Sequence, residues 1–185
     1  MSRADASARL VRAAIALGTA EGVGALSLQG IARTAGVSKA LLLYHFAGKA
    51  ALLQAVVETL ATTGTARLRQ AAAAPDAMEA WRALVRAEAA SGEAALLAAL
   101  ALELEVEGEG LAPLRATREG AATLLATAVL QGVQLTPRVP ADLMGRHLLR
   151  QLDGVVAAAT RRGLTDTALE AELDVAALAL LALGR

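Results

Sequence analysis

The stretch that decides the fold runs from Ser27 to Lys49 and reads SLQGIARTAGVSKALLLYHFAGK. It contains two short segments of helical character on either side of Gly36-Val37. Ser27 and Ser38 stand where the two helices need N-terminal caps, and Gly36 stands where the first helix needs a left-handed residue to end. Two short helices joined by such a turn predict a helix-turn-helix motif, whose second helix enters the major groove of DNA.

Small and apolar residues set the angle at which the two predicted helices cross. Ala32 has to be small because the helices approach closely there, and Gly36 has to adopt a conformation that a side chain disfavours. The apolar residues expected to fill the wedge between the helices are Ile31, Ala35, Val37 and Leu42. These constraints fix the direction of the second helix, so that its outer face is free to contact bases.

The rest of the chain also has the composition of helices. Hydrophobic residues make up 56% of the 185 residues, largely Ala and Leu, whereas aromatic residues make up 2%. Ala and Leu favour helices and aromatic residues favour strands, so we predict an all-α fold. The expected helices span residues 6–20, 27–35, 38–46, 49–70, 77–90, 93–107, 113–134, 141–161 and 167–183.

Charge divides the chain although its formal net charge is zero. Residues 1–50 carry six basic side chains and two acidic ones, whereas residues 76–110 carry two basic and eight acidic ones. The N-terminal part is therefore the one suited to approach a polyanion. Together with Pro75-Asp76, this shift predicts a functional boundary within residues 47–75.

Two segments leave alternatives open. Acidic residues at every second position from Glu103 to Glu109 are typical of a strand, whereas the Ala- and Leu-rich sequence before them favours a helix with a frayed end. The longest uncharged run, from Gly120 to Pro137, contains Thr, Gln and Gly residues. We interpret it as a buried core helix rather than a membrane span, which needs about 20 predominantly apolar residues.

The motif resembles the TetR (tetracycline-repressor) family. The resemblance rests on Ile31-Ala32, on Ala35-Gly36-Val37-Ser38, on Tyr44-His45-Phe46 and on Lys49. It departs from the family at Ala40, where Gly or a Pro-like residue is usual, and at Leu43, where Tyr is usual. The resemblance implies a three-helix DNA-binding head in residues 1–48 and a helical ligand-binding and dimerisation body in residues 49–185. The helix that starts at residue 49 would connect the two.

The residues expected to contact DNA lie in and beside the two short helices. They are Ser27, Gln29, Arg33, Ser38, Lys39, Ala40, Tyr44, His45 and Lys49. Lys39 would contact a guanine edge or a phosphate. Contacts with the phosphate backbone are expected from Gln29, Arg33, Ser38, Tyr44, His45 and Lys49. The alternatives are a purely capping role for Ser27, a solvated side chain for Lys39 and a packed side chain for His45.

Residues of the C-terminal part support weaker expectations. Candidates for a ligand pocket are Met78, Trp81, Leu104, Leu125 and His147, for which ordinary packing is the alternative. The resemblance implies a homodimer built on the last two long helices. Apolar stripes at helical spacing there comprise Leu148, Leu152, Val155, Leu169, Leu173 and Leu180, which would otherwise complete the core of a monomer.

These features predict a sequence-specific DNA-binding transcriptional regulator. We expect a cytoplasmic, homodimeric repressor that binds a near-palindromic operator in double-stranded DNA and is released by a small, apolar effector. With no cysteine and two histidines, the chain offers no convergent catalytic set, so we expect no enzymatic activity, metal or cofactor, and no membrane association. The alternative is a helical protein-interaction module with a vestigial DNA-binding head.

Overall fold

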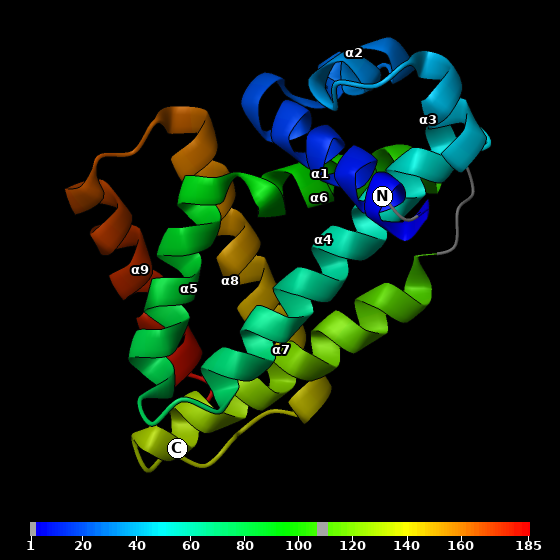
Figure 1. Ribbon diagram of the computed structural model, residues 1–185. Coiled ribbons are helices and arrows are strands. Elements are labelled where there is room, and N and C mark those ends of the chain that lie inside the picture. Colours follow the sequence, from blue (N-terminus) through cyan, green and yellow to red (C-terminus); the bar gives the residue numbers. More distant parts are fainter. Residues whose placement is uncertain (1–2, 107–110) are drawn as a thin grey trace. The chain divides into compact units, whose positions relative to one another are not determined.

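The computed structural model describes residues 3–106 and 111–185, and these residues are predominantly helical (Figure 1). The predicted all-α fold is confirmed, and the predicted bounds differ from the observed ones by a few residues at most. Within these residues the helices are α1 (Arg3–Glu21), η1 (Val23–Ala25, a 3-10 turn), α2 (Leu28–Thr34), α3 (Lys39–His45), α4 (Lys49–Ala72), α5 (Ala77–Ser91), α6 (Glu93–Val106), α7 (Ala112–Gly132), α8 (Ala141–Arg162) and α9 (Asp166–Leu181).

Packing divides the chain into two compact units. The head unit comprises Met1–Leu60 and Leu96–Leu111, and the body unit comprises Ala61–Ala95 and Ala112–Arg185. The division falls inside α4 and inside α6, so each of these helices contributes residues to both units. The predicted boundary after residue 48 concerns function and stays a prediction. The division by packing lies further along the chain, because the first half of α4 packs with the head unit.

The head unit is built on the apolar face of α1. Leu10, Ala14 and Leu17 are buried, as their helical spacing predicts, and Gly18 lies next to them. A Cβ atom at Gly18 would lie 2.8 Å from Cδ1 of Leu96 on α6. The absence of a side chain at Gly18 therefore allows the part of α6 that belongs to the head unit to pack tightly on α1.

The body unit has one apolar core, to which all of its helices contribute. Trp81 of α5, Leu125 of α7 and Leu173 of α9 are completely buried in it, and α7 and α8 cross over a long contact (Figure 1). The uncharged run that begins at Gly120 forms the second half of α7, and most of its residues as far as Leu130 are at least partly buried. It is thus the core helix that the sequence predicts.

The helices α7 and α8 approach each other closely at Gly145. A Cβ atom there would overlap Oγ1 of Thr123 and would lie 2.6 Å from the carbonyl oxygen of Glu119. The Thr123 hydroxyl lies within hydrogen-bonding distance of two carbonyl oxygens, those of Glu119 at 2.9 Å and of Ala141 at 3.2 Å, and is not free to move aside. Glycine at position 145 is therefore a condition for this crossing.

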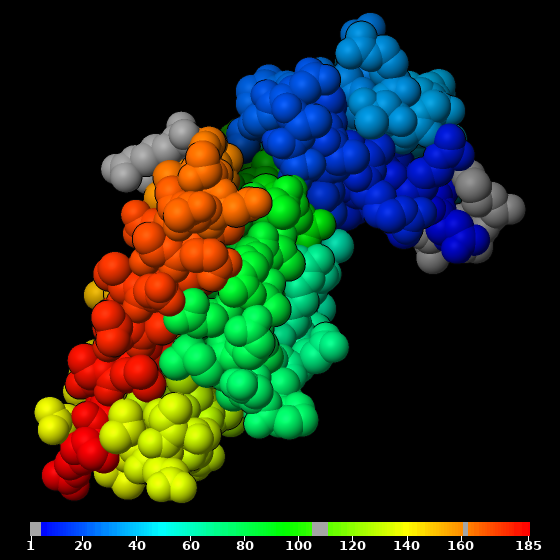
Figure 2. Space-filling view, turned by 90° about the vertical axis from the view of Figure 1, so that its left-hand side faces the viewer, coloured from blue at the N-terminus to red at the C-terminus, as the bar shows by residue number. Residues whose placement is uncertain are grey.

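Ion pairs join α5 to its neighbours in the body unit. Arg67 of α4 lies 2.8 Å from buried Glu88 and 2.8 Å from Glu93. Hydrogen bonding to Glu88 raises the pKa of the Arg67 guanidinium, which therefore stays charged. Figure 2 shows α9 running beside α5, where Arg86 donates two hydrogen bonds to Glu170 at 2.6 and 3.0 Å. These hydrogen bonds lower the pKa of the Glu170 carboxyl.

After α9 the chain pairs with the loop between α7 and α8. Arg138 N–H donates to the carbonyl of Leu183 at 2.7 Å, and Thr136 and Arg185 exchange backbone hydrogen bonds at 2.9 and 3.0 Å. This pairing explains why α9 ends at Leu181, two residues before the predicted end.

The structure decides between helix and strand for part of the segment with alternating acidic residues. Glu103 belongs to α6, which continues to Val106, so the helical alternative holds for this part of the segment. Glu107 and Glu109 lie outside the described residues.

No single helix in the described ranges is long and apolar enough to span a membrane; the pair α3 and α4, bent by 67°, meets the length and composition criteria only when taken together.

Replacement of Gly145 by alanine is expected to destabilise the protein. The new methyl group would clash with the backbone of α7, and such overpacking costs about 1–3 kcal/mol. Gly154→Ala is the matched control on the same helix, because a Cβ atom there meets nothing within 4 Å. It should stabilise the protein by about 0.5–1 kcal/mol through the higher helix propensity of alanine. Urea denaturation of both variants checks this, and equal effects would contradict the close contact.

Candidate DNA-binding surface

The turn between α2 and α3 has the geometry that the sequence predicts. Gly36 adopts a φ of 64°, in the left-handed region. The N–H groups of Gly36 and Val37 donate to the carbonyls of Arg33 at 3.0 Å and of Ala32 at 2.9 Å. This pair of hydrogen bonds is the Schellman motif, which satisfies the last carbonyls of a helix and reverses the chain.

Apolar residues hold the two helices together as expected. Ile31, Ala32 and Leu42 are buried, and Ala35 is 4% exposed, whereas Val37 is half-buried. Leu42 is the inward-facing residue of α3, so the residues on the other side of that helix face solvent. The outer face of α3, defined here as Lys39, Ala40, Leu43 and Tyr44, is exposed. Its side chains are thus available to contact a major groove.

Serine side chains cap both helices of the motif. Ser27 Oγ accepts a hydrogen bond from the N–H of Gly30 at 3.0 Å, and Ser38 Oγ accepts one from Leu41 at 3.1 Å. Both serines are exposed. The capping alternative for Ser27 is thus met in the structure, and Ser38 caps α3 while it remains accessible to a phosphate group. On α2, Gln29 and Arg33 are exposed one turn apart, as predicted.

His45 is held by the head unit itself. Its Nδ1 atom lies 3.3 Å from Oγ of Ser7 on α1, and its ring packs edge-on against Tyr44 with centroids 5.3 Å apart. The residue is half-buried, so the packed alternative describes it better than a freely accessible side chain. Its Nε2 edge remains a candidate for a phosphate contact.

Lys49 lies at the start of α4 and is paired within the head unit. Its Nζ atom donates to Oε1 of Glu103 on α6 at 3.2 Å, and both side chains are partly exposed. A phosphate contact by Lys49 would therefore compete with this carboxylate. No sequence pattern predicts this pairing, because the two residues are 54 positions apart.

Arg9 is a further basic residue at the motif that the sequence analysis did not single out. A Cβ atom at Gly36 would lie 3.1 Å from Nη2 of Arg9, so this exposed side chain of α1 reaches the turn. Its placement depends on the packing of α1 against the motif, which local sequence spacing does not encode.

Comparison with known proteins agrees with this geometry. The family described as "Bacterial regulatory proteins, tetR family" matches residues 10–56, which include the whole helix-turn-helix. The chain is a TetR-family transcriptional regulator. No curated protein matches the sequence. The predicted function of a DNA-binding transcriptional regulator is confirmed. None of these comparisons supports the alternative of a protein-interaction module.

Solved structures share the fold of this TetR-family regulator over nearly the whole chain. A transcriptional regulator from Rhodococcus sp. Rha1 is 26% identical, with a TM-score of 0.75 and coverage of 96% of this chain and 97% of that one. A putative TetR-family transcriptional regulator from Mesorhizobium loti is 20% identical over 100% and 98% of the two chains, with a TM-score of 0.64. The regulator FadR from Bacillus subtilis, solved in complex with stearoyl-CoA, is 13% identical over 94% and 97%, with a TM-score of 0.66.

The candidate ligand residues do not line one common cavity. Trp81 and Leu125 are buried in the core of the body unit, where Met78 packs against them, and Leu104 belongs to the head unit. His147 is half-buried on α8, where burial and the nearby charge of Arg150 lower its pKa. Their role in ligand binding stays a prediction.

Two cavities of the body unit are lined mostly by residues that the sequence did not single out. A cavity of about 510 Å³ lies between the start of α5 and the end of α7. Its lining residues include Asp76, Met78, Glu79, Arg82, Gln131 and Val133. A second cavity, of about 270 Å³, lies between α7 and α8. Cavities depend on the packing between helices, which sequence spacing does not encode. Met78 was the only lining residue among the predicted ligand residues, because it lies one helical turn from Trp81.

The apolar stripes of α8 and α9 pack inside the protomer. Leu148, Leu152 and Leu173 are at most 2% exposed and belong to the core of the body unit, as do Val155 and Leu180, whereas Leu169 is partly buried and packs against this core. This is the alternative in which the stripes complete the core of one chain. A role of these residues in dimerisation stays a prediction, and Val175 and Leu178 are exposed on α9.

Removal of the Glu103 carboxylate is expected to strengthen the binding of duplex DNA. Glu103→Gln frees Lys49 for a phosphate, and loss of a partly exposed ion pair changes the affinity by about two- to fivefold. The slope of log K against log salt should steepen by up to about one unit. Fluorescence anisotropy of a labelled duplex, titrated at several salt concentrations, measures both quantities.

Glu21→Gln removes the same charge from an exposed position of the head unit and serves as the control. If both variants gain affinity equally, the effect is one of net charge and the specific competition for Lys49 is wrong.

Proposed function

We propose that this regulator is a repressor that binds a near-palindromic operator as a homodimer and leaves it when a small molecule binds the body unit. The observation that carries the proposal is the exposed outer face of α3, held outward by the buried Leu42 and by the left-handed turn at Gly36. In a two-fold symmetric dimer the two α3 helices would enter successive major grooves, about 34 Å apart.

The outer face of α3 suggests how bases are read. Lys39 is its only charged residue, and it is placed at the N-terminal end of the helix, where base contacts of such motifs concentrate. Ala40 and Leu43 are apolar and suited to contact the methyl group of thymine. We propose that Lys39 reads a guanine or a phosphate and that the remaining selectivity comes from apolar contacts. Ser27, Gln29, Arg33, Ser38, Tyr44, His45 and Lys49 would position the DNA backbone.

The exposed side chains of α8 and α9 provide a surface for the partner subunit. Leu143 of α8 and Val175 and Leu178 of α9 are large apolar residues with 42%, 64% and 68% of their surface exposed. Burial of such residues against a second copy contributes favourably to association. The buried stripes would support this surface from inside without touching the partner.

The cavity between α5 and α7 is the proposed effector site. Its volume falls within the usual range for small-molecule sites, and its lining combines Met78 and Val133 with Glu79, Arg82 and Gln131. The FadR structure with stearoyl-CoA supports small-molecule binding by this fold. We propose an effector that is largely apolar. It would have to bind the DNA-incompetent state more tightly than the competent one, with α4, which belongs to both units, as the coupling element.

Capture of sheared DNA from the source genome tests the proposed function. Sequencing of the DNA retained by the purified protein at moderate salt should show enrichment of one short near-palindrome. Lys39→Ala should abolish the enrichment and lower the salt slope of non-specific binding by about one unit. Lys39→Arg keeps the charge and should preserve the non-specific affinity.

Two outcomes would count against the proposal. Equal enrichment by Lys39→Ala would mean that α3 does not read the operator through this residue. A folded, dimeric protein that enriches no sequence in the absence of any added ligand would contradict specific DNA recognition by the head unit.

A further inference from the structure

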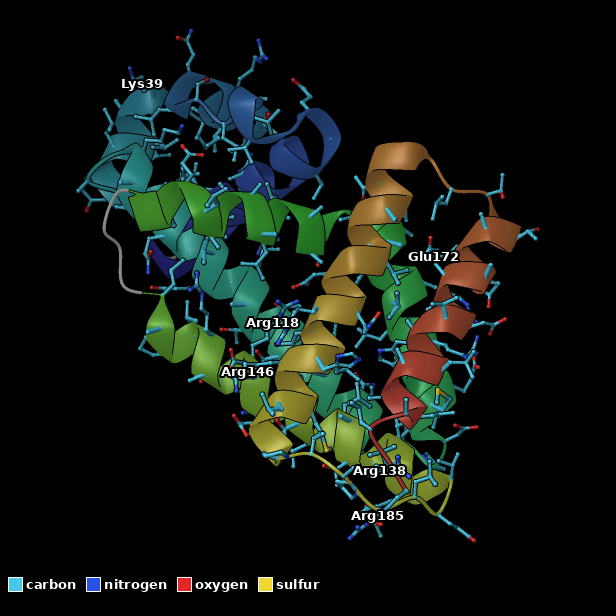
Figure 3. All side chains as sticks on the ribbon, turned by 180° about the vertical axis from the view of Figure 1, so that it is seen from behind. Lys39, Arg118, Arg138, Arg146, Glu172 and Arg185 are labelled. Carbon is cyan, nitrogen blue, oxygen red and sulfur yellow. The ribbon has the colours of Figure 1, made fainter. Side chains whose placement is uncertain are left out.

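The cavity between α7 and α8 is lined mainly by arginine side chains. Figure 3 shows Arg118 and Arg146 on these two neighbouring helices. The charged residues of the lining are Arg115 and Arg118 with Glu119 on α7, and Arg146 and Arg150 with Asp153 on α8. The lining thus combines four guanidinium groups with two carboxylates around a space of about 270 Å³.

The local ion pairs use only part of the donors that the arginines offer. Arg118 donates to Asp153 from Nη2 at 3.2 Å, and Arg146 pairs with Asp142 one turn earlier on α8. Arg150 donates from Nε to the carbonyl of Arg146 at 3.3 Å and makes no ion pair with any residue the structure describes. An arginine carries five N–H donors in a planar fork, so several remain for a further acceptor.

One of these donors is buried without an acceptor. Nε of Arg118 is shielded from solvent and has no hydrogen-bond partner within the described part of the chain. The side chain as a whole is 18% exposed. A buried donor without a partner destabilises the protein, so such a group calls for an explanation. An anion in the cavity supplies one, because its oxygen atoms accept hydrogen bonds from a guanidinium edge.

The two helices hold these like charges in place by packing. The contact of Gly145 with Glu119 and Thr123 lies next to Arg146 in sequence and beside the cavity. The crossing therefore fixes the backbone positions from which the arginine side chains of the two helices extend.

We propose that the cavity between α7 and α8 is a binding site for a small molecule that carries a phosphate or diphosphate group. Guanidinium forks match the geometry of phosphate oxygens, and the buried Nε of Arg118 and the guanidinium of Arg150 have donors left for them. The cavity is too small to enclose a large ligand completely, so the phosphate group would lie inside it and the rest of such a ligand would lie outside. This site is separate from the proposed effector cavity between α5 and α7, and the inference does not depend on the proposed repressor function.

Isothermal titration calorimetry with inorganic pyrophosphate tests the proposal in a low-salt buffer free of other polyanions. We expect one site with a Kd below about 1 mM, as two or three charge-assisted hydrogen bonds would supply. Arg150→Gln should weaken binding about tenfold or more, because it removes a charged donor. Arg150 is exposed, and this substitution leaves the ion pairs of Arg118 and Arg146 intact.

Arg138→Gln is the matched control, since Arg138 is an exposed arginine of the same unit and lies away from Arg118 and Arg146 (Figure 3). It should leave the affinity unchanged. Equal weakening by both variants, or no binding of pyrophosphate by the folded protein, would overturn the proposal. Succinate serves as a dicarboxylate probe, and binding as tight as that of pyrophosphate would overturn the assignment to phosphate.

His147 gives an independent readout, because the chain has only one other histidine, His45. Burial lowers the pKa of His147, and the nearby charge of Arg150 lowers this pKa further. A dianion beside Arg150 opposes this effect, and saturation with pyrophosphate should raise the His147 pKa in an NMR titration. Calorimetric binding that leaves the His147 pKa unchanged would place the anion elsewhere and overturn the assignment.

Discussion

The left-handed turn at Gly36 is the constraint on which DNA recognition depends. Its φ of 64° and the two hydrogen bonds of the Schellman motif end α2 and start the chain toward α3, and Ser38 then caps the new helix. Leu42 fixes the rotation of α3 about its own axis by burial. Everything that the outer face of α3 presents to DNA follows from these local conditions, and the side chains on that face contribute little to stability.

The body unit depends on a second close approach, that of α7 and α8 at Gly145. There, tight packing has an electrostatic consequence, because it brings arginines of both helices to one cavity. In the head unit, packing instead brings opposite charges together, those of Lys49 on α4 and Glu103 on α6. Packing between helices thus decides which charges become neighbours, and these neighbours tune the surfaces that a ligand or DNA can meet.

The sequence predicted the features that depend on neighbouring residues in the chain. It did not predict the features that depend on which helices pack together. Caps such as Ser27 and Ser38, the turn at Gly36 and the helix bounds are governed by residues within one or two turns, so their spacing was sufficient. The stripe of Leu148, Leu152 and Leu173 was correctly assigned as apolar, but periodicity does not distinguish the core of one chain from an interface between two. The pairing of Lys49 with Glu103 and both cavities required the packed structure, because no repeat or motif links the residues involved.

The low aromatic content has a spectroscopic consequence. The chain has one tryptophan and one tyrosine. Trp81 is completely buried in the core of the body unit, whereas Tyr44 is 67% exposed on the outer face of α3. Tryptophan emission therefore reports on the integrity of the body unit alone, and tyrosine absorbance reports on the solvent exposure of the α3 surface. The unmodified protein thus carries one optical probe in each unit, and the folding of the body and the docking of the head can be followed separately in the same sample.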